Sequence, residues 1–174
     1  MAYYLGNIRK IGFDLLRGQG RGEKLMAPDE AEVEKAMQET YTLAKQLSKL
    51  TGVSLKFAQI ERVQTLKKDN ATCFSHCYAM NGEAAFIDAV GNIYACSSLI
   101  GNPKFYLGHV NTGIDSKKQK NVEELIKESM AFCFACPDFK LCGGGCFARW
   151  YGSGQKMAYQ AECALKRMSI DWAN

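Results

Sequence analysis

The sequence predicts a mixed α/β chain with two parts: a strand-helix-strand unit over residues 1–68 and a small cysteine-rich α+β domain over residues 69–174. Two observations predict this division. Before position 60 the apolar residues follow a strand pattern, then a helical pattern, then a strand pattern again. After the polar run KKDNAT at 67–72, glycines and cysteines become dense and helical periodicity becomes rare. The second part is expected to hold a β-hairpin and short helices.

The first predicted strand is the apolar run IRKIGFDLL at 8–16, and a glycine-rich turn follows it at 17–22. The turn resembles a phosphate loop only superficially. Glu23 stands where a dinucleotide fingerprint needs glycine, and the Gly-Lys-Ser/Thr ending of a P-loop is missing. We therefore interpret the segment as a plain turn after a strand.

A helix is predicted between Pro28, which suits a first helical turn, and Gly52, which suits the position after the last one. Its expected buried stripe comprises Val33, Met37, Thr40, Ala44, Leu47 and Leu50. Alternating apolar residues then indicate a second strand at 53–57. Two strands and one helix cannot cover both faces of a parallel sheet, so we expect residues 1–68 to be the end of a larger domain.

The second part contains a predicted β-hairpin over residues 86–96, with its turn at 89–92. We expect His109 to stand at a strand end. The one helix with a clear pattern is predicted from Asn121 to about Phe132, because Asn121-x-x-Glu124 has the spacing of a capping box.

The formal charge is only +4, from 22 Lys and Arg residues against 18 Asp and Glu, and it is scattered along the chain. This excludes the basic footprint of a nucleic-acid-binding protein. Three lysines are expected in a solvated loop: Lys117, Lys118 and Lys120.

The opening MAYYLGNIRKIGFDLL carries charges within a short apolar stretch, unlike a signal peptide or a membrane span. We expect a cytoplasmic protein without membrane or nucleic-acid partners.

Eight cysteines carry the chemistry: Cys73, Cys77, Cys96, Cys133, Cys136, Cys142, Cys146 and Cys163. A reducing cytosol disfavours disulfides at this density, which favours metal ligation; four disulfides are the alternative if an export signal has been removed. The middle four read Cys-x2-Cys-x5-Cys-x3-Cys, and spacing alone would place them around one metal. The glycines at 143–145 are interpreted as tight backbone wrapping beside these cysteines. The three earlier cysteines could present thiolates to another site, with a fourth ligand from elsewhere.

The cysteine spacing resembles a known signature. Cys77, thirteen residues, Gly91, four residues and Cys96, then the middle four cysteines and Cys163, match the seven-cysteine SPASM signature of radical S-adenosylmethionine (SAM) enzymes at every position. The extra Cys73 is similar to the eighth cysteine of members with two fully ligated auxiliary 4Fe-4S clusters, such as the anaerobic sulfatase-maturing enzymes. The resemblance covers residues 73–163.

The resemblance implies two ligand sets that interleave along the chain. One cluster would be bound by Cys73, Cys77, Cys96 and Cys146, and the other by Cys133, Cys136, Cys142 and Cys163. Full thiolate ligation would leave no open iron, so the clusters would transfer electrons. Residues 1–68 would be the C-terminal part of the family's partial barrel, with the turn at 17–22 at the mouth where the cofactor would sit.

The catalytic signature of the family is Cys-x3-Cys-x2-Cys, and here Met80 stands where the third cysteine would follow Cys73 and Cys77. This chain is therefore not expected to cleave SAM alone. SAM and a third 4Fe-4S cluster would belong to a missing N-terminal half, on the same gene or on a separate chain. The resemblance implies a parent oxidoreductase or maturase that modifies a peptide or protein, supplied with electrons by a reductant such as flavodoxin or ferredoxin.

Two other functions compete with this one. Zinc also takes four thiolates, so a structural zinc module is the first; His76 could then be a ligand, although a solvent-facing loop residue is the simpler interpretation. The second is a stand-alone ferredoxin-like carrier or adaptor. Trp150 and Tyr151, which follow the cysteines, are expected to shield a cluster from water rather than to contact a peptide.

Overall fold

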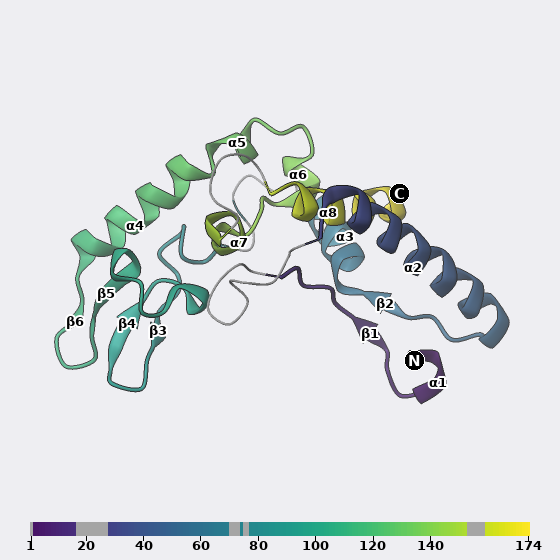
Figure 1. Ribbon diagram of the computed structural model, residues 1–174, viewed down its shortest axis with the longest axis horizontal. Coiled ribbons are helices and arrows are strands. Elements are labelled where there is room, and N and C mark those ends of the chain that lie inside the picture. The colour runs from purple at the N-terminus through teal and green to yellow at the C-terminus, as the bar shows by residue number, and fades with distance from the viewer. Residues whose placement is uncertain (1, 17–27, 70–73, 75–76, 153–158) are drawn as a thin grey trace.

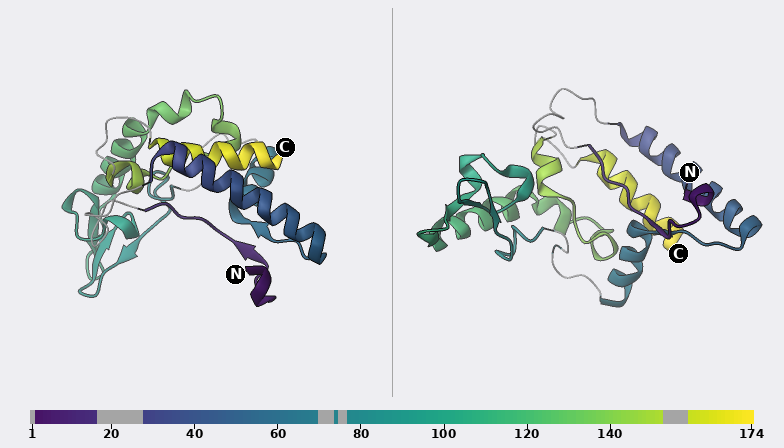
Figure 2. Two further views of the ribbon diagram at one scale, coloured as in Figure 1. Left: turned by 45° about the vertical axis from the view of Figure 1, so that its right-hand side comes forward. Right: turned by 90° about the horizontal axis from the view of Figure 1, so that it is seen from below.

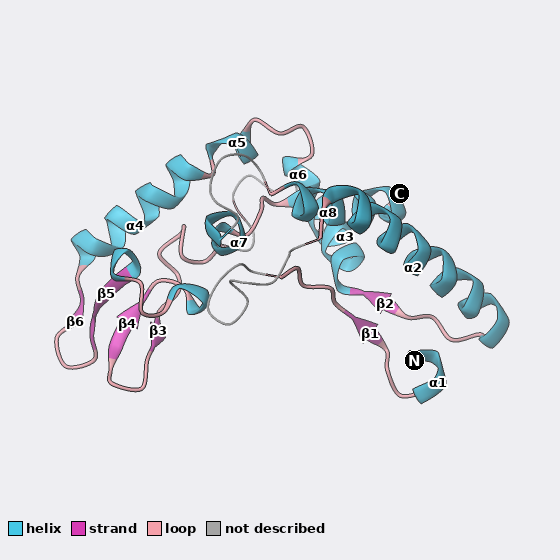
Figure 3. Cartoon of the chain, viewed as in Figure 1, coloured by secondary structure: helices cyan, strands magenta, loops and turns pink. Residues whose placement is uncertain are grey.

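The computed structural model describes residues 2–16, 28–69, 74, 77–152 and 159–174 (Figure 1). The glycine-rich turn at 17–22, Cys73 and His76 lie outside these ranges. Figure 1 shows an elongated chain with a parallel strand pair towards one end and a four-stranded antiparallel sheet at the other. Helices make up most of the region between them (Figure 3). The predicted mixed α/β class is confirmed.

The N-terminal elements are α1 (Ala2–Leu5), β1 (Lys10–Ile11), α2 (Glu30–Thr51), β2 (Lys56–Phe57) and α3 (Ala58–Asp69). β1 and β2 are parallel, so the predicted strand-helix-strand order is confirmed. Each strand is shorter than the apolar run that predicted it. Among the described residues the two strands have only each other as ladder partners, and the pairing ends where their backbones separate.

The ends of α2 follow the capping residues. The Asp29 side chain accepts the Glu32 N–H at 2.8 Å, and the Glu32 side chain accepts the Asp29 N–H at 3.0 Å, which completes a capping box. At the other end Gly52 has a φ of 70°, the left-handed conformation that favours glycine after a helix. The predicted limits of this helix are confirmed to within two residues.

The buried stripe of α2 is shorter than predicted. Its buried members are Val33, Met37 and Tyr41, and Thr40, Ala44 and Leu47 are half-buried. The Tyr41 ring fills this core because it packs against the rings of Phe57 and Trp172, with centroids 4.8 and 5.6 Å away. Leu50 was predicted to be buried, but its side chain is 82% exposed. The last turns of α2 extend beyond the helix that covers it (Figure 1).

That covering helix is α8 (Gln160–Ala173), which packs on both α2 and α3. Figure 2 shows α8 running alongside α2 in both views. The Tyr41 hydroxyl meets the Ser169 hydroxyl at 3.0 Å in this interface. The prediction of a single patterned helix in the second part is therefore wrong. The buried face of α8 is small or polar, with Ala161, Glu162 and Ser169 among its residues, so its hydrophobic periodicity is weak.

The predicted hairpin is confirmed as β3 (Phe86–Ile87) and β4 (Asn92–Tyr94). Two further strands, β5 (Tyr106–His109) and β6 (Gly113–Ile114), extend it into an antiparallel sheet of order β3-β4-β5-β6. The sequence predicted only the end of β5, and it did not predict β6. Short 3-10 turns at Ser97–Leu99 and Pro103–Phe105 connect β4 to β5. His109 ends β5, as predicted.

The helix predicted from Asn121 begins earlier, since α4 spans Ser116–Ser129. Asp115 is its N-cap, and its side chain accepts the N–H groups of Lys117 and Lys118. Lys117, Lys118 and Lys120 were expected in a loop; they instead lie exposed at the start of this helix. The Lys118 ammonium is 4.6 Å from the centre of the Tyr106 ring. Three short helices follow: α5 (Ala131–Phe134), α6 (Phe139–Cys142) and α7 (Phe147–Gly152).

An aromatic core holds the cysteine-rich part together. Phe74, Phe105, Leu107, Ile126 and Met130 are almost completely buried in it, and Trp150 joins them at 8% exposure. Cys77, Cys96, Cys133 and Cys146 pack against this core. Within the described ranges, no helix is both long and apolar enough to cross a membrane.

Candidate metal centre

The seven described cysteines line two separate cavities. Cys77, Cys96 and Cys146 line one of about 190 Å³, which we name the first cysteine cavity. Cys133, Cys136, Cys142 and Cys163 line another of about 470 Å³, the second cysteine cavity. All seven are half-buried free thiols. Cys73, the remaining predicted ligand, lies outside the described residues.

The first cysteine cavity collects residues from three parts of the chain. Cys77 begins a turn, Cys96 lies two residues after the end of β4, and Cys146 immediately precedes α7. The pKa of the Cys77 thiol is raised to about 11, chiefly by burial and to a smaller extent by the neighbouring thiols of Cys146 and Cys96. The backbone N–H groups of Met80 and Phe147 act in the opposite direction, because they stabilise the thiolate.

The second cysteine cavity is built by α5, α6 and α8. Burial raises the pKa of the Cys163 thiol, the positive charge of Arg167 opposes this effect, and the resulting value is about 11. Burial also raises the pKa values of Cys133 and Cys142. The Gly145 backbone N–H stabilises the Cys133 thiolate, and the Lys166 ammonium stabilises that of Cys142. The Gly145 N–H group and the Lys166 ammonium therefore both favour the thiolate, which is the form of cysteine that binds a metal.

The glycines between Cys142 and Cys146 allow the backbone to pass close to the core. Gly143 and Gly144 have φ values of 68° and 79°, in the left-handed region. A Cβ atom on Gly144 would lie 2.3 Å from the Phe74 ring, so no larger residue fits there. This geometry supports the predicted tight wrapping of the backbone.

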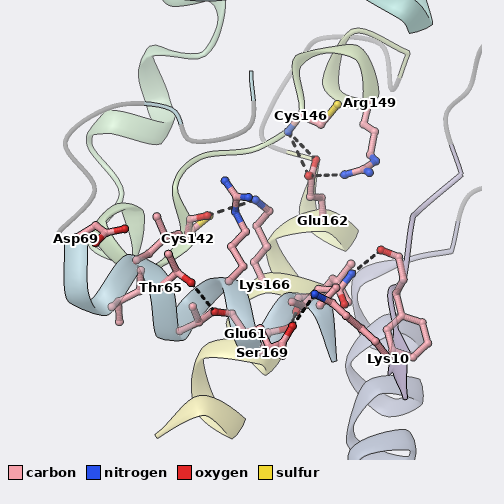
Figure 4. Close-up of a pocket in the computed structure, with 18 residues that line it drawn as sticks. Lys10, Glu61, Thr65, Asp69, Cys142, Cys146, Arg149, Glu162, Lys166 and Ser169 are labelled. Atoms are coloured by element: carbon pink, nitrogen blue, oxygen red, sulfur yellow. Dashed lines mark hydrogen bonds and ion pairs between the residues drawn. The ribbon is translucent and has the colours of Figure 1, made fainter. Parts of the chain in front are cut away.

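The Cys142–Cys146 loop is fastened to α8 by charged side chains (Figure 4). Glu162 is 3% exposed, and its carboxylate accepts the Cys146 N–H at 3.1 Å and an Arg149 N–H at 2.7 Å. Lys166, one turn further along α8, donates to the carbonyl of Cys142 at 3.4 Å and to that of Gly144. Sequence reasoning missed both residues, although a Glu and a Lys four apart around Cys163 were a helical signal.

A third, larger cavity of about 820 Å³ opens beside the loop, between α3 and α8 (Figure 4). Its lining includes the polar side chains of Lys10, Glu61, Arg62 and Asp69, together with Cys142 and Cys146. It therefore reaches one member of each cysteine set. Lys10 and Glu61 form an ion pair across its rim at 2.5 Å.

The donor chemistry of the two cysteine cavities suits iron-sulfur clusters. The second offers four thiols, the full complement of a 4Fe-4S cluster, and the first offers three among the described residues. Either volume far exceeds the roughly 10–15 Å³ that one water needs, so each has room for a group larger than a single ion. No three described His, Cys, Asp or Glu side chains are arranged to hold a single metal ion.

In the cluster-free chain, alkylation of Cys77 and Cys163 by iodoacetamide is expected to accelerate about tenfold per pH unit from pH 8 to pH 10. The thiolate is the nucleophile, and with both pKa values raised to about 11 its fraction keeps rising across this window. Mass-spectrometric time courses would measure the rates, with a small-molecule thiol in the same tube as control. A rate that levels off below about pH 9.5, as for an ordinary thiol of pKa near 8.5, would contradict the burial-raised values.

Comparison with known proteins finds similarity at the level of fold. No protein-family model matches the sequence, and no curated protein matches it. A solved structure described as native anSMEcpe with bound AdoMet, a radical SAM sulfatase-maturating enzyme, is similar with a TM-score of 0.57 and 17% identity. The similarity covers 91% of this chain and 44% of that chain. This chain therefore has a fold related to part of a radical SAM maturase and spans less than half of its length.

Proposed function

We propose that this chain is the C-terminal region of a radical SAM enzyme that modifies a peptide or protein, and that it holds two auxiliary 4Fe-4S clusters. One observation carries the proposal: the described cysteines lie in two cavities whose membership is that of the two SPASM ligand sets. Chain order alone would group Cys146 with Cys142, yet it lies with Cys77 and Cys96. The related fold of a radical SAM maturase is independent support.

In this function, Cys77, Cys96 and Cys146, with Cys73, hold one cluster, and the four thiols of the second cysteine cavity hold the other. When bound, such fully ligated clusters accept and pass on single electrons. The chain's own residues set the conditions for this. Lys166 and Arg167 offset the negative charge of the second thiolate set, and the buried Trp150 and half-buried Tyr151 keep water from the core beside it.

The proposal extends to the whole enzyme. SAM and a third cluster would be bound by an N-terminal half that supplies the missing barrel strands, on the same or a separate chain. The substrate would be a peptide or protein that loses electrons to the auxiliary clusters, and flavodoxin or ferredoxin would be the external redox partner. The cytoplasm, where reduced thiols persist, is the compartment that suits this chemistry.

The test is metal content. The chain is purified without oxygen and reconstituted with iron and sulfide, and iron, sulfide and zinc are then measured per chain alongside electron paramagnetic resonance spectra. About eight irons and eight sulfides are expected, because eight thiolates complete two four-iron clusters. One or two zincs without acid-labile sulfide would overturn the proposal and leave a structural zinc module. About four irons would instead indicate a single-cluster, ferredoxin-like carrier.

A further inference from the structure

We propose that Glu162 and Lys166 of α8 are positioning residues that clamp the Cys142–Cys146 loop at two points and thereby direct its two cysteines into different cavities. This inference deepens the proposed function and rests on it for its consequence, two clusters in place of one. The clamp itself consists of hydrogen bonds between α8 side chains and the loop backbone. It can therefore be tested without any metal.

The two side chains hold different parts of the loop by opposite charges: Lys166 holds its first half and Glu162 its last residue. Lys166 donates to the carbonyl of Cys142 at the start of the loop and to that of Gly144 in its middle. At the end of the loop, the backbone nitrogen of Cys146 lies 3.1 and 3.2 Å from the two carboxylate oxygens of Glu162, which accept its N–H. A cation on carbonyls and an anion on an amide are each the stronger, charge-assisted kind of hydrogen bond. The loop is thereby fixed at both ends.

The helix geometry explains why one element can serve both cavities. Glu162 and Lys166 are four residues apart, so they project from the same face of α8 and meet the loop together. Cys163 is the next residue after Glu162, about 100° further round the helix, and it lines the second cysteine cavity. α8 therefore supplies a ligand to one set while it fixes the backbone of Cys146, which belongs to the other.

The buried carboxylate needs a counter-charge, and Arg149 provides it. Glu162 is 3% exposed, and an unpaired charge at that depth would be strongly unfavourable. Arg149 contacts Glu162 at 2.7 Å and also pairs with Asp14, which follows β1. The clamp is thus anchored to the N-terminal unit as well as to α8.

The clamp is tested first by hydrogen exchange on the whole chain, both as purified without oxygen and after iron removal. Glu162→Ala is expected to speed exchange of the Cys146 amide about 10- to 100-fold, the loss that follows removal of a charged hydrogen-bond partner. Glu162→Gln keeps an oxygen acceptor and is expected to stay within a few-fold of wild type. Asp171→Asn, an exposed carboxylate on the same helix, is the matched control and should change nothing.

Whether the clamp keeps Cys142 and Cys146 in different cysteine cavities is tested by oxidising the iron-free chain with diamide and mapping the disulfides that form. In wild type, Cys146 is expected to pair with Cys77 or Cys96. In Glu162→Ala and Lys166→Met, pairs between Cys146 and the second set should rise at least tenfold, with circular dichroism confirming that each variant is folded. If the variants fold and neither the exchange nor the pairing changes, the clamp is overturned. Because both readings need no iron, a wild-type chain without clusters would refute the proposed function and leave the clamp standing.

Discussion

Replacement of Gly144 by alanine is expected to lower the free energy of unfolding of the iron-free chain by about 2–5 kcal/mol. Two costs add. The φ of 79° is left-handed, which costs an L-residue about 1–2 kcal/mol. The new methyl group would also lie 2.3 Å from the ring of Phe74, which is 1% exposed, and forcing extra atoms into a packed core costs about 1–3 kcal/mol. Chemical denaturation would measure the difference.

Gly101→Ala is the matched control for this variant. Gly101 has a similar φ of 85°, but a Cβ atom there would meet nothing within 4 Å. It should therefore carry only the backbone cost of about 1–2 kcal/mol. If the two variants were equally stable, the loop would not pass against Phe74 as described, and the tight wrapping beside the cysteines would be refuted.

The sequence predicted elements whose signals are local. The limits of α2 follow from Asp29, Glu32 and Gly52, which act on the backbone within a few residues of themselves. The β3–β4 hairpin is similar, because Asp88 closes its turn by accepting the N–H groups of Val90 and Asn92. Such contacts form whatever the rest of the chain does, so a pattern in the sequence suffices to find them.

Elements that depend on distant partners were largely missed: only the end of β5, at His109, was predicted, and β6 and α8 were not. β5 and β6 contain glycines that predict a break. In the ladder Gly108 lies opposite Ile114, and a Cβ atom on Gly108 would lie 2.1 Å from the carbonyl oxygen of the neighbouring Gly113. Here glycine permits close approach of two strands. α8 was missed because its small buried residues pack well only against α2, which is more than a hundred residues earlier in the chain.

The candidate site also combines features that local spacing predicts with features that only distant packing decides. Spacing identified the cysteines as ligands but grouped Cys146 with Cys142, and only the resemblance to the SPASM signature implied that they separate. In the structure each lines the cavity of its own cysteine set, and both also border the larger cavity beside the loop. The contacts that separate them come from Glu162 and Lys166, whose effect on the loop depends on where α8 packs. No spacing rule contains that information.

Single cysteine replacements are expected to fall into two classes that follow the cavities rather than the order of the chain. Cys96→Ser and Cys146→Ser should each impair the cluster of the first cysteine cavity, and Cys142→Ser that of the second. The reason is separation: the two thiol sets line different cavities, so loss of one ligand acts on one cluster. Iron content and paramagnetic resonance spectra after reconstitution would assign each variant to a class.

Double variants make this prediction decisive. Cys96→Ser with Cys146→Ser removes two ligands of one cluster, so about four irons should remain on the other. Cys96→Ser with Cys142→Ser removes one ligand from each, so both clusters should be impaired and the spectra of both altered. Ser97→Ala, beside Cys96 in the first cysteine cavity, controls for disturbance of its wall and should retain about eight irons. If Cys146→Ser instead matched Cys142→Ser, the four consecutive cysteines would share one metal centre, as their spacing alone suggests, and the two-cluster assignment would fail.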